Sequence, residues 1–220
     1  MKKVYLVEDD PNLGYILKEY LELNNFDVQL ETDGQDAIAN FTDADICILD
    51  LMLPVKDGFE VAKYIRSISN IPLLFLTAKS LKVDKLKAFK IGADDYLVKP
   101  VDEEELIARI RAILSRYSEV NQKIEYSIGD YAFDHSNQTL TINGDTLRLT
   151  QRESLILLEL CKYQNKIVSR DAMLKKIWGD NDYFNRRSMD VFISKLRKYL
   201  SRDHSIEIKN IHGKGFILIC

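Results

Sequence analysis

Residues 46–54 read Ile46-Cys47-Ile48-Leu49-Asp50-Leu51-Met52-Leu53-Pro54, and this stretch decides the fold of the first half of the chain. A short apolar run bounded by turn residues is typical of a buried strand in a parallel sheet. Asp50 then lies at the carboxyl end of that strand, where open α/β sheets place their binding sites. Taken alone, Asp50 is explained equally well as a cap of the next helix, so its meaning depends on the rest of the sequence.

Strand and helix patterns alternate through residues 1–118. Apolar runs predict strands at residues 4–7, 26–30, 46–49, 72–77 and 96–99. Apolar residues at helical spacing predict helices at about 13–21, 37–41, 59–68, 82–91 and 103–115. Five strands that alternate with five helices imply an α/β fold with a doubly wound, five-stranded parallel sheet.

Polar side chains lie at the ends of four of these strands. The acids Glu8–Asp10 follow the first strand and Asp50 follows the third, while Thr77 and Lys99 are the last residues of the fourth and fifth. In a parallel sheet these ends share one edge, where two or three carboxylates require a cation, and ligation by oxygen alone favours Mg²⁺. A hydroxyl and an ammonium group opposite the metal suit a phosphoryl group on Asp50. Each residue also has a simpler role as a cap, a strand residue or a solvated lysine, but their joint placement favours a site.

Composition excludes several other classes of protein. Hydrophobic residues make up 46% of the 220 residues, and no apolar run approaches the length of a membrane span. The acids at Glu8–Asp10 end the first apolar stretch too early for a signal peptide. The three cysteines, Cys47, Cys161 and Cys220, are widely spaced. Such spacing favours a reducing cytoplasm and argues against a disulfide framework or a zinc site.

Charge divides the chain into an acidic and a basic half. Residues 1–118 contain 15 lysines and arginines against 21 acids, whereas residues 126–220 contain 15 against 11. Residues 119–125 are polar, have no stable apolar pattern and are predicted to be a linker. An acidic half joined to a basic half indicates that the second half is the one that meets a polyanion.

The second half begins with strand patterns and continues with helices. Residues 131–134 and 139–142 alternate apolar and polar side chains, and Asn143-Gly144 is a strong signal for a two-residue hairpin. Thr150 and Glu153 have the spacing of a capping box at the start of a helix. A second helix is predicted from Ser169 to Trp178, followed by a loop at 180–184.

The third helix, at about 185–200, has an apolar stripe and a basic face. This pattern suits an amphipathic surface helix, but two shorter helices before it favour a recognition helix for the major groove of DNA. Asp190 is expected to orient a neighbouring basic side chain or helix end. The side chains predicted to face DNA are Arg186, Arg187, Val191, Ser194, Lys195, Arg197 and Lys198.

A β-hairpin is predicted to close the chain, with strands at 206–211 and 216–219. Its tip carries His212, Lys214 and two glycines, which suits close approach to a phosphate backbone or a minor groove. An ordinary hairpin turn explains the same residues if the hairpin is considered alone.

The strand-end residues make the first half similar to the receiver domain of two-component response regulators, over residues 1–118. The resemblance implies that Asp50 is the phospho-acceptor and that Glu8, Asp9, Asp50 and the backbone carbonyl of Met52 bind Mg²⁺. It further implies that Thr77 and Lys99 contact the phosphoryl oxygens, that the Lys99–Pro100 peptide is cis, and that Tyr96 is the switch aromatic.

Further charges resemble the dimer face of the OmpR/PhoB subfamily. The implied pairs between two copies are Lys85 with Glu105, Asp95 with Arg109, and Asp94 with Arg116. A solvated surface is the simpler explanation for such a set. Exposed pairs contribute only about 0–1 kcal/mol each, so a dimer built on them is expected to be weak.

Residues 126–220 resemble the winged helix-turn-helix output domain of the same subfamily, which is a smaller α+β fold. The run from Arg186 to Lys198 carries most of this resemblance. Ser194 and His212 stand where members of the subfamily often carry a basic residue, so base preference cannot be transferred from a relative.

These features together predict a cytoplasmic transcription regulator controlled by a sensor histidine kinase. Its expected partners are that kinase, double-stranded DNA and a second copy of the chain. An enzyme with an aspartyl-phosphate intermediate is a weaker alternative, because Met52 stands where such phosphatases usually carry a second acid. A regulator that dimerises without phosphate is the other alternative.

Overall fold

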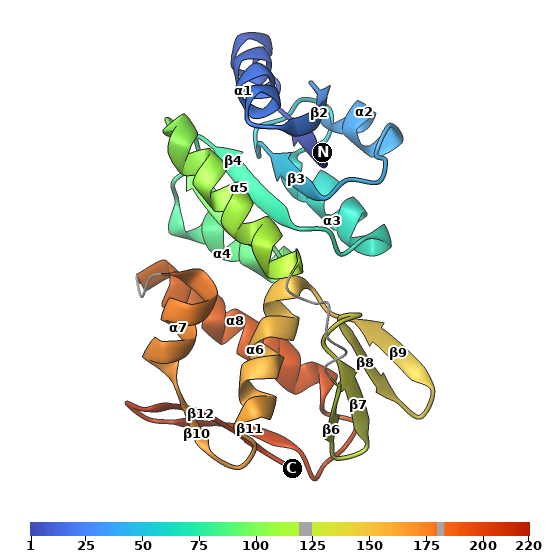
Figure 1. Cartoon of the computed structure of the whole chain (residues 1–220), viewed down its shortest axis with the longest axis vertical. Coiled ribbons are helices and arrows are strands. Elements are labelled where there is room, and N and C mark those ends of the chain that lie inside the picture. Colours follow the sequence, from blue (N-terminus) through green and yellow to red (C-terminus); the bar gives the residue numbers. More distant parts are fainter. Residues whose placement is uncertain (119–124, 180–182) are drawn as a thin grey trace. The chain divides into compact units, whose positions relative to one another are not determined.

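The computed structural model describes residues 1–118, 125–179 and 183–220 (Figure 1). The chain divides into two compact units, Met1–Ser118 and Glu119–Cys220. The predicted linker, apart from Glu125, lies outside the described residues, and so do residues 180–182 of the predicted loop. Each unit is described by itself.

The first unit is built on a parallel sheet with the strand order β2-β1-β3-β4-β5 (Figure 1). Its strands are β1 (Lys2–Val7), β2 (Phe26–Glu31), β3 (Ile46–Leu49), β4 (Leu73–Thr77) and β5 (Asp95–Val98). The register pairs Val7 with Leu49, and Leu49 with Phe75, so neighbouring strands end side by side. The predicted α/β fold with a five-stranded parallel sheet is confirmed.

Five helices cover the sheet, and acidic caps fix where three of them begin. The helices are α1 (Pro11–Leu23), α2 (Gly34–Ala39), α3 (Gly58–Ile68), α4 (Lys82–Ile91) and α5 (Glu103–Ser118). Asp10 caps α1, Asp33 caps α2, and Asp57 forms a capping box with Glu60 at the start of α3. These side chains satisfy backbone N–H groups that the first helical turn leaves unpaired. Buried side chains of α1 and α5 pack together with β1, β3 and β4 in one apolar core.

The second unit has a winged-helix arrangement of two small sheets and three helices (Figure 1). An antiparallel sheet contains β6 (Glu125–Ile128), β7 (Tyr131–Asp134), β8 (Thr139–Ile142) and β9 (Asp145–Arg148). The helices are α6 (Gln151–Lys162), α7 (Arg170–Trp178) and α8 (Tyr183–Tyr199). A three-stranded sheet with the order β10-β12-β11 contains β10 (Ile167–Ser169), β11 (Glu207–Ile211) and β12 (Gly215–Ile219).

Local signals in this unit correspond to the observed turns and caps. Asn143 and Gly144 both have positive φ angles, 51° and 85°, as the predicted hairpin turn requires. The capping box of Thr150 and Glu153 is present at the start of α6. The sequence did not indicate β10, because three residues are too few to show a strand period.

A buried histidine joins the first sheet of this unit to α6. His135 is 4% exposed, and its Nδ1 lies 2.7 Å from the Ser154 hydroxyl oxygen. Burial and the positive charge of Lys162 hold the pKa of His135 below its ordinary value of 6.5, although the charges of Asp134 and Glu159 act in the opposite direction. The imidazole is therefore stabilised in its neutral form.

We expect the second unit to lose stability as the pH falls below 6.5, the ordinary pKa of histidine. Because the pKa of His135 is lower in the folded state than in the unfolded state, protons bind preferentially to the unfolded chain. The contribution is present above the unfolded pKa and is lost as the pH falls through the folded one. Urea unfolding at several pH values should show a shallower pH dependence for His135→Gln, with His204→Gln, at an exposed histidine, as the control. Identical pH profiles for wild type and His135→Gln would contradict this assignment.

Candidate functional site

The carboxyl edge of the parallel sheet gathers three carboxylates. One ligand oxygen from each of Glu8, Asp9 and Asp50 lies within 4.8 Å of the others. Glu8 and Asp50 are buried, whereas Asp9 is exposed. Asp50 is placed by β3, whose end is held by a hydrogen bond from the Asp50 amide to the carbonyl of Val7. The set offers the oxygen ligands that a divalent cation such as Mg²⁺ prefers.

Lys99 lies between two of these carboxylates. Its Nζ donates to Glu8 Oε2 at 2.6 Å and to Asp50 Oδ2 at 2.5 Å. The Met52 amide donates to Asp50 Oδ1 at 2.9 Å, and the Thr77 side chain also hydrogen-bonds to Asp50. The residues predicted from the ends of four strands are thus brought into one polar pocket. The Lys99–Pro100 peptide is cis, as predicted.

The pKa values of the two buried carboxyls that contact Lys99 shift in opposite directions. Burial raises the pKa of Glu8 above its ordinary value, and the hydrogen bond and charge of Lys99 offset this only in part. Burial acts in the same direction on Asp50, but hydrogen bonds from Lys99, Met52 and Thr77, with the charge of Lys99, hold the pKa of Asp50 below its ordinary value. Asp50 therefore stays ionised at neutral pH, which a carboxylate nucleophile requires.

Two glycines let neighbouring elements approach the loop that follows Asp50. A Cβ atom at Gly58 would lie 2.0 Å from the carbonyl oxygen of Asp50, and one at Gly34 would lie 1.9 Å from that of Lys56. No side chain fits at such distances without moving the backbone. The starts of α2 and α3 consequently fix the path of this loop, a role that the sequence alone did not reveal.

Tyr96 is linked to Thr77 through the loop after β4. Tyr96 is buried, and its hydroxyl donates to the carbonyl of Lys79 at 2.7 Å. The amide of Lys79 donates to Thr77 Oγ1 at 3.3 Å. A displacement of the Thr77 hydroxyl would therefore be transmitted to the Tyr96 ring through the backbone of Lys79.

The charges of the predicted dimer face are paired within one chain. Arg109 binds Asp95 at 3.0 Å and Glu105 at 2.7 Å. The Nζ of Lys85 lies 5.5 Å from the centroid of the Tyr96 ring. The side chain of Arg116 lies outside the described part of the structure.

The expectation that Asp94 belongs to this exposed face is wrong. Asp94 is 2% exposed, and its carboxylate accepts hydrogen bonds from the Leu73 amide at 2.9 Å and from Arg66 at 3.3 Å. Because Asp94 directly precedes β5, its side chain points towards the start of β4. Asp94 has a structural role there.

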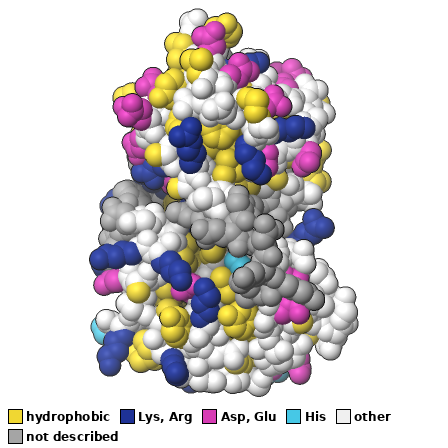
Figure 2. Space-filling model, in the orientation of Figure 1, with side chains coloured by type: hydrophobic (Ala, Val, Ile, Leu, Met, Phe, Trp, Pro, Cys, Tyr) yellow, Lys and Arg dark blue, Asp and Glu magenta, His cyan; other side chains and the backbone are white. Residues whose placement is uncertain are grey.

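The basic face of α8 is divided between exposed side chains and internal contacts. Arg186, Arg187, Ser194 and Lys198 are exposed, and Val191 is half-buried. Lysine and arginine side chains are spread over the visible face of this unit (Figure 2). The exposed Arg186 lies 3.6 Å from the carboxylate of Asp171.

Two predicted DNA-facing residues also make contacts within this unit. The Nζ of Lys195 lies 3.0 Å from the carboxylate of Glu153, whose side chain is 2% exposed. This ion pair joins α8 to α6, and the contact of Lys195 with DNA stays a prediction. Arg197 donates from Nε to the carbonyl of Ile208 on β11 at 2.8 Å.

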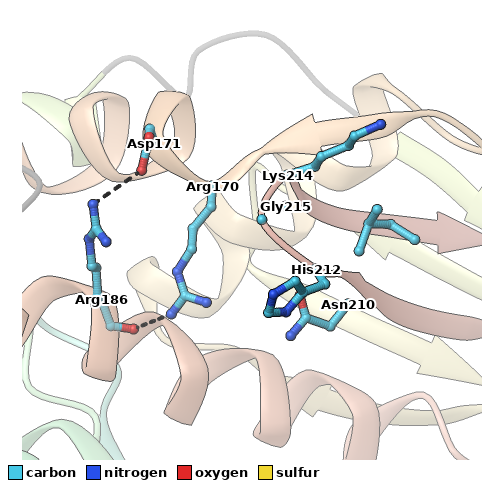
Figure 3. A pocket seen from close by; sticks show the side chains of 9 residues that line it. Arg170, Asp171, Arg186, Asn210, His212, Lys214 and Gly215 are labelled. Carbon is cyan, nitrogen blue, oxygen red and sulfur yellow. Dashed lines mark hydrogen bonds and ion pairs between the residues drawn. The ribbon is translucent and has the colours of Figure 1, made fainter.

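A cleft lies where the hairpin tip meets the starts of α7 and α8 (Figure 3). Its volume is about 350 Å³, and it is lined by Arg170, Asp171, Arg186, Asn210, Ile211, His212, Gly213, Lys214 and Gly215. The sequence reading missed Arg170. The signal that indicates it is Asp190, an acid within a basic helix, whose carboxylate binds Arg170 at 2.6 Å.

An acidic pocket on a parallel sheet followed by a winged-helix unit defines a class of two-domain transcription regulators, and comparison with known proteins agrees. Residues 4–111 match the family described as "Response regulator receiver domain", and residues 144–218 match "Transcriptional regulatory protein, C terminal". The chain is 49% identical to transcriptional regulatory protein RprY of Bacteroides fragilis, covering 99% of this chain and 94% of the relative. It is 37% identical to response regulator ArlR of Staphylococcus aureus, covering 99% and 100%.

Solved structures that are similar over the whole chain point to the same family. DrrB of Thermotoga maritima, described as an OmpR/PhoB homologue, has 30% identity and a TM-score of 0.52 over the full length of both chains. A mutant of RitR has 25% identity and a TM-score of 0.80 over 99% of both chains. The chain belongs to the response regulators of two-component systems, in the OmpR/PhoB subfamily. Its described residues contain no helix that is both long and apolar enough to cross a membrane.

Proposed function

We propose that this protein is a DNA-binding transcription regulator that is switched by phosphorylation of Asp50. The observation that carries the proposal is the position of Asp50, which is ionised, buried and in contact with both Lys99 and Thr77. A phosphoryl group on Asp50 would meet an ammonium and a hydroxyl group that can bind its oxygens. The phosphodonor is proposed to be a sensor histidine kinase, as membership of the family implies.

Mg²⁺ is the proposed cofactor of this reaction. Receiver domains generally bind Mg²⁺ at acidic residues, and the oxygen ligands of Glu8, Asp9 and Asp50 fit such an ion. The backbone carbonyl of Met52 is the proposed fourth protein ligand. The ion would neutralise charge between the Asp50 carboxylate and an incoming phosphate. Lys99 would then move its bonds from Glu8 towards the phosphoryl oxygens.

The proposed switch runs from Thr77 through Lys79 to Tyr96. A phosphoryl oxygen that attracts the Thr77 hydroxyl would shift the loop whose carbonyl holds the Tyr96 hydroxyl. Such a local change can act only by favouring one of two existing conformations of α4, β5 and α5. Self-association through this face is the proposed result.

The charged face itself explains why such a dimer would be weak before phosphorylation. Arg109 is already bound to Asp95 and Glu105 of its own chain, so a partner's acids must compete with these contacts. The proposed contacts between copies involve Lys85, Glu105, Asp95 and Arg109. Arg116 is also proposed, whereas Asp94 is not, because it is buried.

We expect Arg109→Met to remove most of the gain in self-association that phosphorylation brings. The substitution removes the cation of the proposed pairs but keeps the aliphatic stem. Sedimentation velocity with and without a small phosphodonor measures the effect. Arg111→Met is the matched control, because Arg111 lies on the same helix and contacts Asn24 instead. Unchanged dimerisation of Arg109→Met would exclude this face, and a wild-type dimer without phosphate would favour the regulator that needs no phosphorylation.

The second unit is the proposed DNA-binding domain, comprising residues 126–220 after a linker at 119–125. Its proposed contacts are on α8 and on the hairpin: Arg186, Arg187, Val191, Ser194, Lys195, Arg197, Lys198, His212 and Lys214. Lys195 and Arg197 also contact Glu153 and the carbonyl of Ile208 within the unit. Binding to two neighbouring half-sites, arranged as direct repeats by family resemblance, would couple DNA occupancy to the receiver dimer.

The proposal describes a regulator and not an enzyme. Phosphoryl transfer to Asp50 modifies the protein itself, and Met52 leaves no second acid at the position that an aspartyl phosphatase would use. The cytoplasm is the proposed location, since Cys47, Cys161 and Cys220 are free thiols.

A further inference from the structure

Arg170, the first residue of α7, contacts the other two elements that enclose the cleft of the second unit (Figure 3). Its backbone amide donates to the carbonyl of Lys214 at the hairpin tip at 3.1 Å. Its Nη2 donates to the carbonyl of Arg186 at 2.7 Å and to the carboxylate of Asp190 at 2.6 Å, both on α8. The guanidinium carbon lies 5.5 Å from the centroid of the Phe216 ring on β12. One residue at the start of α7 thus joins α8 to the hairpin.

The backbone of the hairpin packs closely against β10 next to Arg170. Ser169 pairs with Gly215, and Gly215 has a φ angle of 155°. A Cβ atom at Gly215 would lie 2.0 Å from the carbonyl oxygen of Val168. The hairpin tip is therefore held at a fixed place beside Arg170.

Asp190 is the residue of α8 whose carboxylate binds Arg170. An acid on the basic face of α8 would repel the DNA backbone if its charge were uncompensated. The ion pair with Arg170 cancels that charge. The planar guanidinium can bind a carboxylate and a carbonyl group at once, which a lysine ammonium on a flexible stem does with less geometric control.

We propose that Arg170 is a positioning residue that locks the hairpin tip to α8, so that Arg186 and Lys214 present one binding surface to a phosphate group of the DNA backbone. This inference rests on the proposed DNA-binding function of the second unit and deepens it. Arg186 and Lys214 line the same cleft, and the side chain of Arg170 lies between them (Figure 3). Two cations on separate elements bind one strand well only if their spacing is fixed before the DNA arrives.

The test removes the Arg170–Asp190 pair without changing the net charge. The double variant Arg170→Met/Asp190→Asn loses one positive and one negative charge, so weaker binding cannot be attributed to altered overall charge. The double variant Arg202→Met/Asp145→Asn is the matched control, since it removes an exposed ion pair elsewhere in the same unit. Thermal denaturation of each full-length variant checks that it is folded.

The measured quantity is the loss of DNA affinity that Lys214→Ala causes in the wild type and in each double variant. The probe is a short duplex that the wild-type protein selects from random DNA, with a scrambled duplex beside it, titrated at several salt concentrations. In the wild type, loss of one phosphate contact should lower affinity about eightfold at 0.1 M salt and reduce the salt slope by about one. In the variant without the Arg170–Asp190 pair, Lys214→Ala should lower affinity less than about twofold. The hairpin tip is then no longer fixed relative to α8, so Lys214 contributes little to binding before it is removed.

The possible outcomes separate this inference from the proposed function. An equal loss on Lys214→Ala in both backgrounds overturns the role of Arg170 while leaving DNA binding intact. Wild-type protein that binds neither duplex overturns the DNA-binding function itself. Should the double variant fail to fold, Asp190→Asn alone supplies the second test, because it keeps the bond from Arg170 to the Arg186 carbonyl. The effect of Lys214→Ala is expected to be intermediate in that variant, and a full effect there overturns the proposal.

Discussion

Asp50→Asn is expected to abolish phosphorylation of the protein completely. The amide has nearly the shape of the carboxylate, so the hydrogen bonds from Met52 and Thr77 can be retained. What is lost is the negative charge and the nucleophilic oxygen, and without them no acyl phosphate forms. Because Lys99 keeps its bond to Glu8, the fold of the pocket should persist.

The measurement is the intact mass after incubation with a small phosphodonor and Mg²⁺. Wild type should gain the mass of one phosphoryl group, and chelation of the metal should strongly reduce that gain. Asp27→Asn is the matched control, because it makes the same substitution at an exposed position of β2. A phosphoryl group on Asp50→Asn would show that another side chain is the acceptor.

Glu153→Ala is expected to destabilise the second unit strongly. Glu153 is 1% exposed, and its carboxylate accepts from Lys195 at 3.0 Å, Tyr199 at 3.2 Å and the Thr150 amide at 2.9 Å. Its removal leaves a half-buried ammonium and two other donors without a partner. Breaking a buried charge pair from one side costs about 3–5 kcal/mol. For a domain of this size, that lowers the melting temperature by on the order of 15 °C.

Calorimetry of the full chain can follow the unfolding transition of this unit. Glu207→Ala is the control, since the ion pair of Glu207 with Lys209 is exposed and should contribute about 1 kcal/mol or less. Adding Lys195→Met to Glu153→Ala should recover part of the loss, because no unpaired charge then remains.

The same experiment decides the role of Lys195. If Lys195 supports α8 through Glu153, Lys195→Ala should destabilise the unit even without DNA. If Lys195→Ala leaves stability unchanged but lowers DNA affinity and relaxes base preference, Lys195 acts by contacting DNA.

The architecture of the first unit and the members of its polar cluster follow from local patterns in the sequence. Period and length identify each strand, and a parallel sheet places every carboxyl end at one edge. For that reason the strand pattern alone predicts that Glu8, Asp50, Thr77 and Lys99 lie together. In the second unit, caps and turn residues predicted the helices and hairpins because these signals act over a few residues.

The pairing of charges between distant elements, in contrast, appears only in the folded unit. Helical spacing shows that Lys195 lies near a basic face, but Glu153, which binds it, is 42 residues away on another helix. Asp94 resembles its half-buried neighbour Asp95 in sequence, yet it turns inward to Arg66 and Leu73. Arg170 gains its role from α8 and the hairpin, neither of which adjoins it in the sequence. Such contacts depend on how elements pack in space, whereas sequence period describes one element at a time.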